Sequence, residues 1–103
     1  MVTVVNRHKF KGKGEYVGRP SALGNPFKLK SAGGQFKRGE TLECYREWLR
    51  EQWKVGGKAK HELLRLVACA KVGDLNLVCS CKPHPCHGDV LKEAIEALIN
   101  KGY

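Results

Sequence analysis

The sequence contains no apolar run long enough to cross a membrane, and this absence is the first limit on the class of protein. The amino-terminal stretch MVTVVNRHKF also lacks the apolar segment and the small-residue cleavage site of a secretory signal. The sequence has no phosphate-binding or dinucleotide-binding glycine fingerprint, no pair of carboxylates at short spacing and no internal repeat. We therefore expect a cytoplasmic protein without a membrane partner. If the protein is a nucleotide-processing enzyme, its sequence offers few candidate catalytic groups.

The length and composition are those of one small globular domain. The chain has 103 residues, of which 42% are hydrophobic, so we expect residues 1–103 to form a single α/β domain. The formal net charge of +9 is unevenly distributed, because residues 1–30 hold seven Lys or Arg against one acid, whereas residues 61–103 hold five against five. Such a basic surface attracts the phosphates of nucleotides or nucleic acids, or an anionic protein, although it also suits a surface that only keeps the protein soluble.

Hydrophobic patterning predicts two buried strands and three helices. Residues 2–5 and 75–79 have the apolar composition of buried strands. Apolar residues recur at helical spacing over 41–53, over 59–71 and from Gly88 onward. This order predicts a small three-layer α/β domain with a mainly parallel, Rossmann-like sheet and helices on both faces.

A basic loop rich in glycine and proline is predicted over residues 8–39. A loop this long in a small domain is usually either functional or disordered. Backbone amides in glycine-containing turns can bind anions, and an arginine can hold a phosphate with two hydrogen bonds, whereas the alternative is a packed surface loop. Parallel pairing of the strands would bring the end of the first strand into the same pocket. The predicted ligand-binding residues are Asn6, Arg7, Arg19, Ser21, Gly24 and Asn25.

Three of the five cysteines and two of the four histidines fall between Leu75 and Leu91. An odd number of cysteines in a chain without an export signal argues against a disulfide framework and for a metal site or a reactive thiol. Zinc takes about four sulfur or nitrogen ligands. Alternate residues of a strand lie on the same face, with α-carbons about 6.6 Å apart. The thiolates of Cys79 and Cys81 could therefore approach one ion. The predicted zinc ligands are Cys79, Cys81, Cys86 and His87.

The same cluster has two other interpretations. A thiol at a helix amino terminus has a lowered pKa, which would make Cys86 a nucleophile, with His87 or His84 as its base and Asp89 as the orienting carboxylate. Adjacent cysteine and histidine side chains need not face each other, however. In the structural interpretation, Cys79 is a small core residue and His87 caps the helix. The sequence leaves the metal, reactive and structural interpretations open.

Four motifs follow one another in a specific order and spacing over nearly the whole chain: YVGRPS, LGNPF, CSCKP and CHGDVL. In these motifs the chain resembles a family of short bacterial and phage proteins known only as a domain of unknown function. Ser80 stands where that family usually has tryptophan. The carboxyl half is similar, more weakly, to a second uncharacterised family, in which glutamate replaces Cys81 and arginine replaces Gly88. The resemblance implies a fold and a site but no reaction.

The sequence thus predicts a small, phage-encoded protein that binds a phosphate-bearing ligand, either a nucleotide or a nucleic acid. The pocket would be formed by the basic loop and the Cys/His turn, with zinc as the expected cofactor. Two alternatives remain. One is a phage protein that inhibits a host nucleic-acid enzyme by direct contact in the host cytoplasm. The other is a nucleotide-processing enzyme whose candidate catalytic groups are Cys86, His87 and Asp89.

Overall fold

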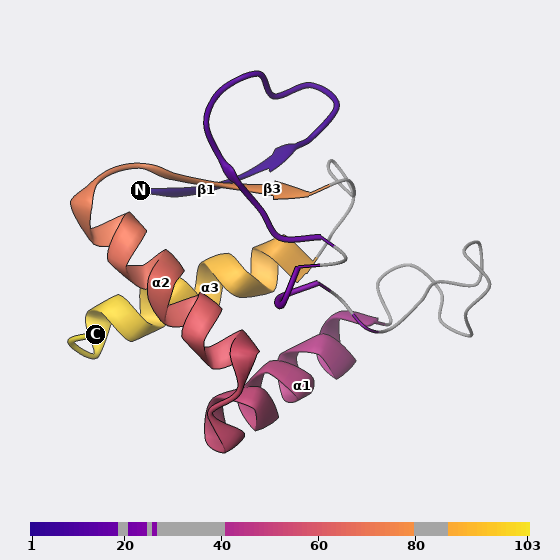
Figure 1. The fold of residues 1–103 in the computed structure, drawn as a ribbon, viewed down its shortest axis with the longest axis vertical. Coiled ribbons are helices and arrows are strands. Elements are labelled where there is room, and N and C mark those ends of the chain that lie inside the picture. Colours follow the sequence, from indigo (N-terminus) through magenta and orange to yellow (C-terminus); the bar gives the residue numbers. More distant parts are fainter. Residues whose placement is uncertain (19–20, 25, 27–40, 80–86) are drawn as a thin grey trace.

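The computed structural model describes residues 1–18, 21–24, 26, 41–79 and 87–103, and its helices and strands follow the predicted order (Figure 1). Every predicted strand and helix is present, and its ends lie within about two residues of those expected. The elements are β1 (Val2–Asn6), β2 (Glu15–Tyr16), α1 (Thr41–Val55), α2 (Lys58–Val72), β3 (Leu75–Cys79) and α3 (His87–Asn100).

The described strands form one parallel sheet in the order β1-β3-β2. The central strand β3 pairs with β1 from Leu75 opposite Val2 to Cys79 opposite Asn6. Its other edge pairs with the short strand β2, where Glu15 lies opposite Leu77. The predicted α/β class and the parallel sheet are therefore confirmed.

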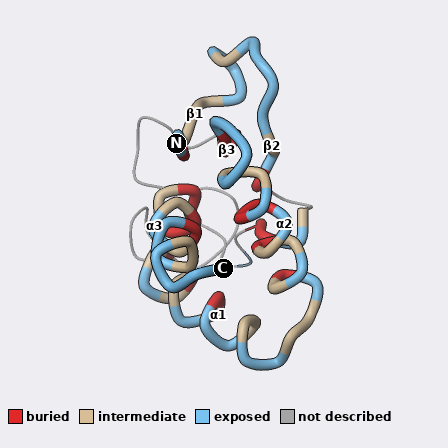
Figure 2. Tube along the Cα trace, turned by 90° about the vertical axis from the view of Figure 1, so that its left-hand side faces the viewer, coloured by how far each residue is buried: buried red, intermediate tan, exposed pale blue. Residues whose placement is uncertain are grey.

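The layers on the two faces of the sheet differ. Both α2 and α3 contact the sheet, and α1 packs against these two helices on the side away from the strands (Figures 1 and 2). The loop over residues 7–14 lies on the opposite side of the sheet (Figure 1). We expected helices on both faces, but the helices of the described residues all lie on one face. The pattern of β3 explains this, because Leu75, Leu77 and Cys79 are buried on the helical side while Asn76 and Val78 are only half-buried.

The core lies between the sheet and the three helices. Its fully buried side chains come from β3, all three helices and the segment after β2, and they include Leu23, Tyr45, Leu66, Leu77 and Leu91. The turn between α1 and α2 depends on glycine: Gly56 has a φ of 73°, a left-handed conformation that other residues adopt only with strain. None of the helices that the structure describes is both long and apolar enough to span a membrane.

Candidate functional site

The carboxyl ends of the three strands meet at one edge of the sheet, which we call the strand-end edge. β1 ends opposite Cys79, and Tyr16 of β2 lies opposite Val78. The pairing extends one residue further on both sides of β3. The backbone N–H of Arg7 donates to the carbonyl oxygen of Cys79 (2.9 Å), and that of Val17 donates to the carbonyl oxygen of Val78 (3.0 Å). The structure thus brings the amino-terminal basic segment to the end of β3, as parallel pairing predicted, and ligands commonly bind at such an edge.

Arg7 projects from the strand-end edge over an aromatic ring. The guanidinium carbon lies 5.4 Å from the centroid of the Tyr16 ring, and Nη1 donates to the Tyr16 hydroxyl at 3.5 Å. Both residues are exposed. No ion pair within the described residues includes Arg7. The ring therefore orients the guanidinium, while its charge stays available to an anionic ligand.

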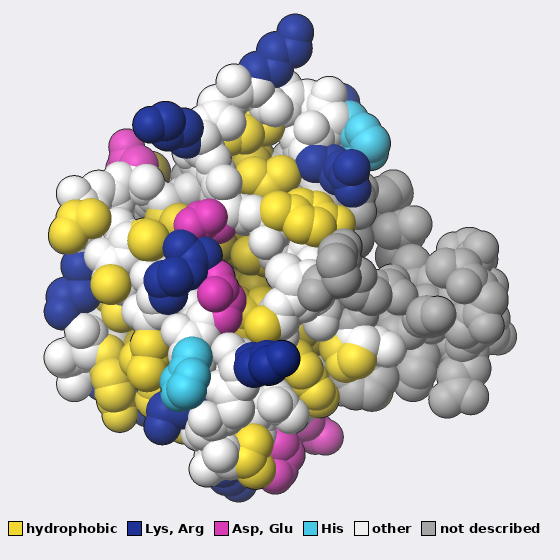
Figure 3. All heavy atoms as spheres, viewed as in Figure 1, with side chains coloured by type: hydrophobic (Ala, Val, Ile, Leu, Met, Phe, Trp, Pro, Cys, Tyr) yellow, Lys and Arg dark blue, Asp and Glu magenta, His cyan; other side chains and the backbone are white. Residues whose placement is uncertain are grey.

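The basic loop, residues 7–14, begins with a turn that Asn6 organises. The Asn6 Oδ1 accepts from the backbone N–H of His8 (2.8 Å), and its carbonyl oxygen accepts from those of Lys9 (3.1 Å) and Phe10 (2.9 Å). The structure therefore gives Asn6 a role in shaping the loop. The loop contains no acidic residue. Its charged side chains are all exposed, and Lys and Arg side chains gather on this part of the surface (Figure 3). The charged side chains of the basic loop are those of Arg7, Lys9, Lys11 and Lys13.

The end of the basic loop is held closely against β3. The side-chain amide of Asn76 donates to the carbonyl oxygen of Lys13 at 3.2 Å. A Cβ added at Gly14 would lie 2.5 Å from Cγ2 of Val78 and 3.0 Å from the carbonyl oxygen of Asn76. Because one of these atoms belongs to the backbone, no side-chain rotation alone could make room. Glycine at position 14 thus permits the approach that sets the path of the basic loop.

The acid that follows the basic loop is bound to a helix. Oε1 of Glu15 accepts from Nη1 of Arg65 on α2 at 2.6 Å, and Arg65 also pairs with Glu62. The pKa of Arg65 is raised above its usual value, chiefly by the hydrogen bond to Glu62 and then by that to Glu15. Glu15 therefore fastens β2 to α2, and its charge is matched by Arg65 instead of by the lysines of the loop.

His87, the first residue of α3, is buried behind the strand-end edge. Its Nε2 lies 2.7 Å from the carbonyl oxygen of Val17, and its ring meets the Tyr45 ring edge-on at 5.2 Å between centroids. Because a carbonyl oxygen only accepts, Nε2 carries the hydrogen and donates. This nitrogen is thus engaged in holding the segment after β2. A metal or a substrate proton would have to use Nδ1.

Tyr45 of α1 holds the same segment at a second point. Its buried hydroxyl donates to the carbonyl oxygen of Leu23 at 2.6 Å. Together, His87 and Tyr45 anchor Val17 and Leu23, which are both fully or almost fully buried. Two helices thus fix the chain that leaves β2, and they fix it through backbone carbonyls.

Of the predicted zinc ligands, the structure places Cys79 and His87, while Cys81 and Cys86 lie outside the described residues. Cys79 is completely buried at the end of β3 and belongs to the hydrophobic core. The described part of the chain contains no group of three or more His, Cys, Asp or Glu side chains that could hold a metal ion. The packing of Cys79 suits the structural interpretation, and the four-ligand zinc site stays a prediction.

Among the ligand-binding residues predicted in the loop after β2, the structure describes Ser21 and Gly24, while Arg19 and Asn25 lie outside the described residues. Ser21 and Gly24 form successive turns: the Ser21 N–H donates to the Gly18 oxygen (2.9 Å), and the Gly24 N–H donates to the Ser21 oxygen (3.0 Å). The amide of Gly24 is thus used within the turn. The Ser21 hydroxyl is buried and has no hydrogen-bond partner in the described structure.

Asp89 lies in the first turn of α3. A carboxylate there is stabilised by the unpaired amides and by the positive end of the helix dipole. The sequence had suggested that Asp89 orients His87 as a base. The described hydrogen bond of His87 Nε2 is with the carbonyl oxygen of Val17, and the pairing of Asp89 with His87 stays a prediction. Cys86, the proposed nucleophile, lies outside the described residues.

Two aromatic residues at this site were not selected from the sequence. Tyr16 orients Arg7, and Tyr45 anchors Leu23. The sequence could have pointed to Tyr16 as a site residue, because Tyr16 lies in the YVGRPS motif next to a run of basic residues. Tyr45 has the spacing of an ordinary core residue of a helix, so nothing in the sequence distinguishes its hydrogen bond.

The fold and the site define a small parallel α/β domain with an exposed basic loop that begins at its strand-end edge. The chain belongs to the family described as Domain of unknown function (DUF4326), whose model matches residues 4–97. The family resemblance predicted from the motifs is thus confirmed. No curated protein and no solved structure matches the chain. The function is therefore argued from the geometry of the site.

Proposed function

We propose that this protein binds a phosphate-bearing ligand at the strand-end edge, and that Arg7 and the basic loop hold its phosphates. The observation that carries the proposal is the placement of Arg7. Its guanidinium lies over the Tyr16 ring, is exposed, and has no ion pair in the described residues. An oriented guanidinium is well suited to a phosphate, because its planar fork can donate two parallel hydrogen bonds.

The surface around Arg7 favours a nucleic-acid strand over a free nucleotide. Three lysines follow Arg7 at alternate positions of the basic loop, and all are exposed. A row of separate cations matches a series of backbone phosphates better than one compact phosphate group. The exposed ring of Tyr16 and the half-buried ring of Phe10 lie in the same segment, where bases could stack on them. The ligand we propose is therefore a single-stranded nucleic acid.

The test is the salt dependence of binding to a short single-stranded oligothymidylate. Replacing Arg7 with alanine should weaken binding about tenfold and make the slope of log K against log salt less negative by about one, because one phosphate contact is lost. Fluorescence anisotropy between about 50 and 200 mM salt measures both quantities. Lys58→Ala is the matched control, because Lys58 is exposed at the start of α2, far from the basic loop in Figure 1. Equal slopes for the three proteins would remove Arg7 from the site.

A metal at the Cys/His turn is a separate part of the proposal. If zinc is held by Cys79, Cys81, Cys86 and His87, the purified, reduced protein should contain one equivalent of zinc. The Cys81→Ser variant should lose it, whereas Cys44→Ser, a half-buried thiol of α1, should keep it. Elemental analysis measures this directly. If the wild-type protein contains no metal, even after it is refolded with zinc, the zinc hypothesis is wrong. The proposal of phosphate binding would not be affected by that result.

The bacterial or phage origin and the cytoplasmic location are retained as predictions. They rest on the sequence, and phosphate binding does not depend on them. A host protein partner would be bound through the same basic surface, so an oligonucleotide should compete with that partner. Competition separates this alternative from a partner that binds elsewhere.

A further inference from the structure

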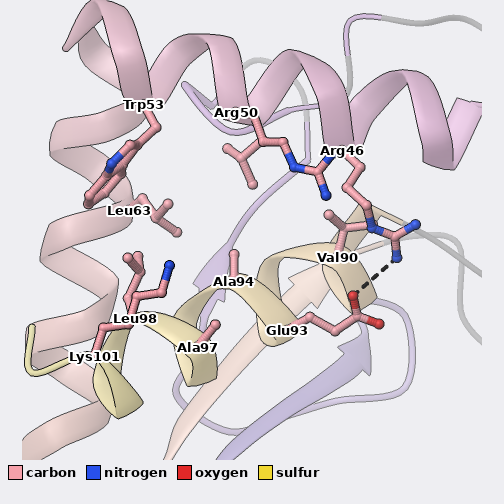
Figure 4. Close-up of a pocket in the computed structure, with 11 residues that line it drawn as sticks. Arg46, Arg50, Trp53, Leu63, Val90, Glu93, Ala94, Ala97, Leu98 and Lys101 are labelled. Carbon is pink, nitrogen blue, oxygen red and sulfur yellow. Dashed lines mark hydrogen bonds and ion pairs between the residues drawn. The ribbon is translucent and has the colours of Figure 1, made fainter.

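A groove of about 390 Å³ lies on the helical side of the molecule, between α1 and α3 (Figure 4). Its floor and walls are mostly apolar. Leu49, Leu63 and Val90 are buried at its base, and Ala94 and Leu98 continue it along α3. None of these residues belongs to the strand-end edge. The groove is thus a second concave surface that the proposed function does not use.

The groove is linear and has one closed end. The α3 residues that line it run from Val90 to Leu98, which is about 12 Å at the helical rise, and Lys101 lies just beyond the end of the helix. At one end α2 stands across the space, and Trp53 and Leu63 lie there (Figure 4). A helix could not pass through that end. The volume is near the lower bound of the range of about 300–1,000 Å³ for small-molecule sites, so a short, narrow ligand fits better than a protein segment.

The polar groups of the groove are mostly positive. Arg46 pairs with Glu93 at 3.1 Å and with Glu43, so its charge is matched. Arg50 and Lys101 also line the groove and are exposed. Neither forms an ion pair within the described residues. In Figure 4 both side chains lie along the space between α1 and α3. An anionic group on the ligand would therefore meet two uncompensated cations.

We propose that this groove binds a small amphiphilic anion, an unbranched alkyl carboxylate. The alkyl chain would lie along the apolar floor between α1 and α3, where the short side chains of Ala94 and Ala97 leave room for it. The carboxylate would pair with Arg50, whose fork can donate two hydrogen bonds, and with Lys101. An apolar trough with a few charged groups at its lip is the usual construction of such sites. This proposal stands independently of phosphate binding.

Isothermal titration calorimetry with octanoate and decanoate, each below its micelle concentration, tests the proposal. We expect saturable binding of one decanoate per chain. Octanoate should bind about fifteen-fold more weakly, because it buries two fewer methylenes and each is worth about a factor of four. An affinity that does not depend on chain length would overturn the proposal, because the apolar floor would then not be used.

Variants locate the site. Arg50→Glu should weaken decanoate binding at least tenfold, and Ala97→Trp, at an exposed position of α3, should abolish it by filling the groove. Lys58→Glu makes the same charge change outside the groove and should alter binding less than twofold. If Arg50→Glu and Lys58→Glu weaken binding equally, the effect is one of net charge and the proposal fails. Circular dichroism checks that each variant is folded, and Ala97→Leu replaces Ala97→Trp if the larger residue unfolds the chain.

Absence of saturable decanoate binding to the wild-type protein also overturns the proposal.

Discussion

The arginines that join elements on the helical side of the molecule and the arginine at its strand-end edge are held in different ways. On the helices, Arg46 pairs with two carboxylates, and its pKa is raised mainly by the hydrogen bond to Glu93. Arg65 likewise pairs with two carboxylates. At the strand-end edge, Arg7 is instead held by the ring of Tyr16. The contrast shows that the arginines which join elements are matched by acids, while Arg7 is oriented by an aromatic ring and has no ion pair among the described residues.

The two regions also differ in how their backbone is held. Helices α1 and α3 fix the segment after β2 through buried hydrogen bonds to the carbonyl oxygens of Val17 and Leu23. The basic loop is held by the turn at Asn6, by an exposed contact between Asn76 and Lys13, and by the close packing of Gly14 on β3. We therefore expect substitutions behind the edge to affect stability strongly, and substitutions of the exposed side chains of the loop to affect binding more than stability.

The largest expected effect comes from removing His87. His87→Ala deletes a buried ring, leaves the Val17 oxygen without its donor and removes the edge-on contact with Tyr45. We expect the free energy of unfolding to fall by about 3 kcal/mol, from the cavity and the unpaired carbonyl together. Urea denaturation followed by circular dichroism measures it.

Tyr45→Phe is the companion substitution, because it removes only the hydroxyl that donates to Leu23. We expect a loss of about 1–2 kcal/mol, since a buried carbonyl loses its partner while the ring stays. A loss from His87→Ala no greater than that of an exposed substitution would contradict the anchoring role of the histidine and remove the contrast between the two regions.

A smaller effect is expected at Gly14. Gly14→Ala forces a methyl group toward Val78 and the backbone of β3, which should cost about 1–3 kcal/mol as overpacking and displace the basic loop. Gly12→Ala is the matched control, because the Cβ added there would meet only the ring of Phe10, which can move. Oligonucleotide affinity and unfolding are measured on both variants. If both bind and unfold alike, the close approach at Gly14 does not set the path of the loop.

The smallest effect on stability is expected at Arg65. Arg65→Ala breaks the pairs with Glu15 and Glu62, but these side chains are one third to one half exposed, so water screens the interaction. We expect a loss of at most about 1 kcal/mol. Because the pKa of Arg65 is raised, its guanidinium stays charged throughout the neutral range, so this contribution is not lost as the pH rises there. A loss above about 2 kcal/mol would show that the pair is a principal anchor of β2.

Much of the fold followed from local patterns in the sequence. The helices and strands were predicted because their apolar residues repeat at regular spacing, and parallel pairing correctly placed Arg7 beside the end of β3. The position of all the described helices on one face of the sheet was not predictable in the same way. The loop that lies on the other side of the sheet is positioned by Asn76 and Gly14, whose contacts with distant residues leave no periodic signal.

The candidate site was predicted less completely than the fold. The positive charge of the loop was visible in the sequence, but the contact of Arg7 with the Tyr16 ring depends on the three-dimensional path of the loop. Cys79 and His87 were selected for their chemistry, and the structure places both in buried positions at the carboxyl end of β3 and the start of α3. Residue type alone does not distinguish a ligand from a packed thiol or from a histidine that holds a backbone carbonyl.

The most direct test of the central claim is heteronuclear NMR during titration with single-stranded oligothymidylate. Phosphate binding at the strand-end edge predicts that the amide signals of residues 7–14 and 16–18 shift in proportion to bound ligand. Those of residues 46–53 and 90–101, which line the groove on the helical side, should stay in place. Shifts confined to the helical groove, or none in the basic loop at saturating oligonucleotide, would contradict the account.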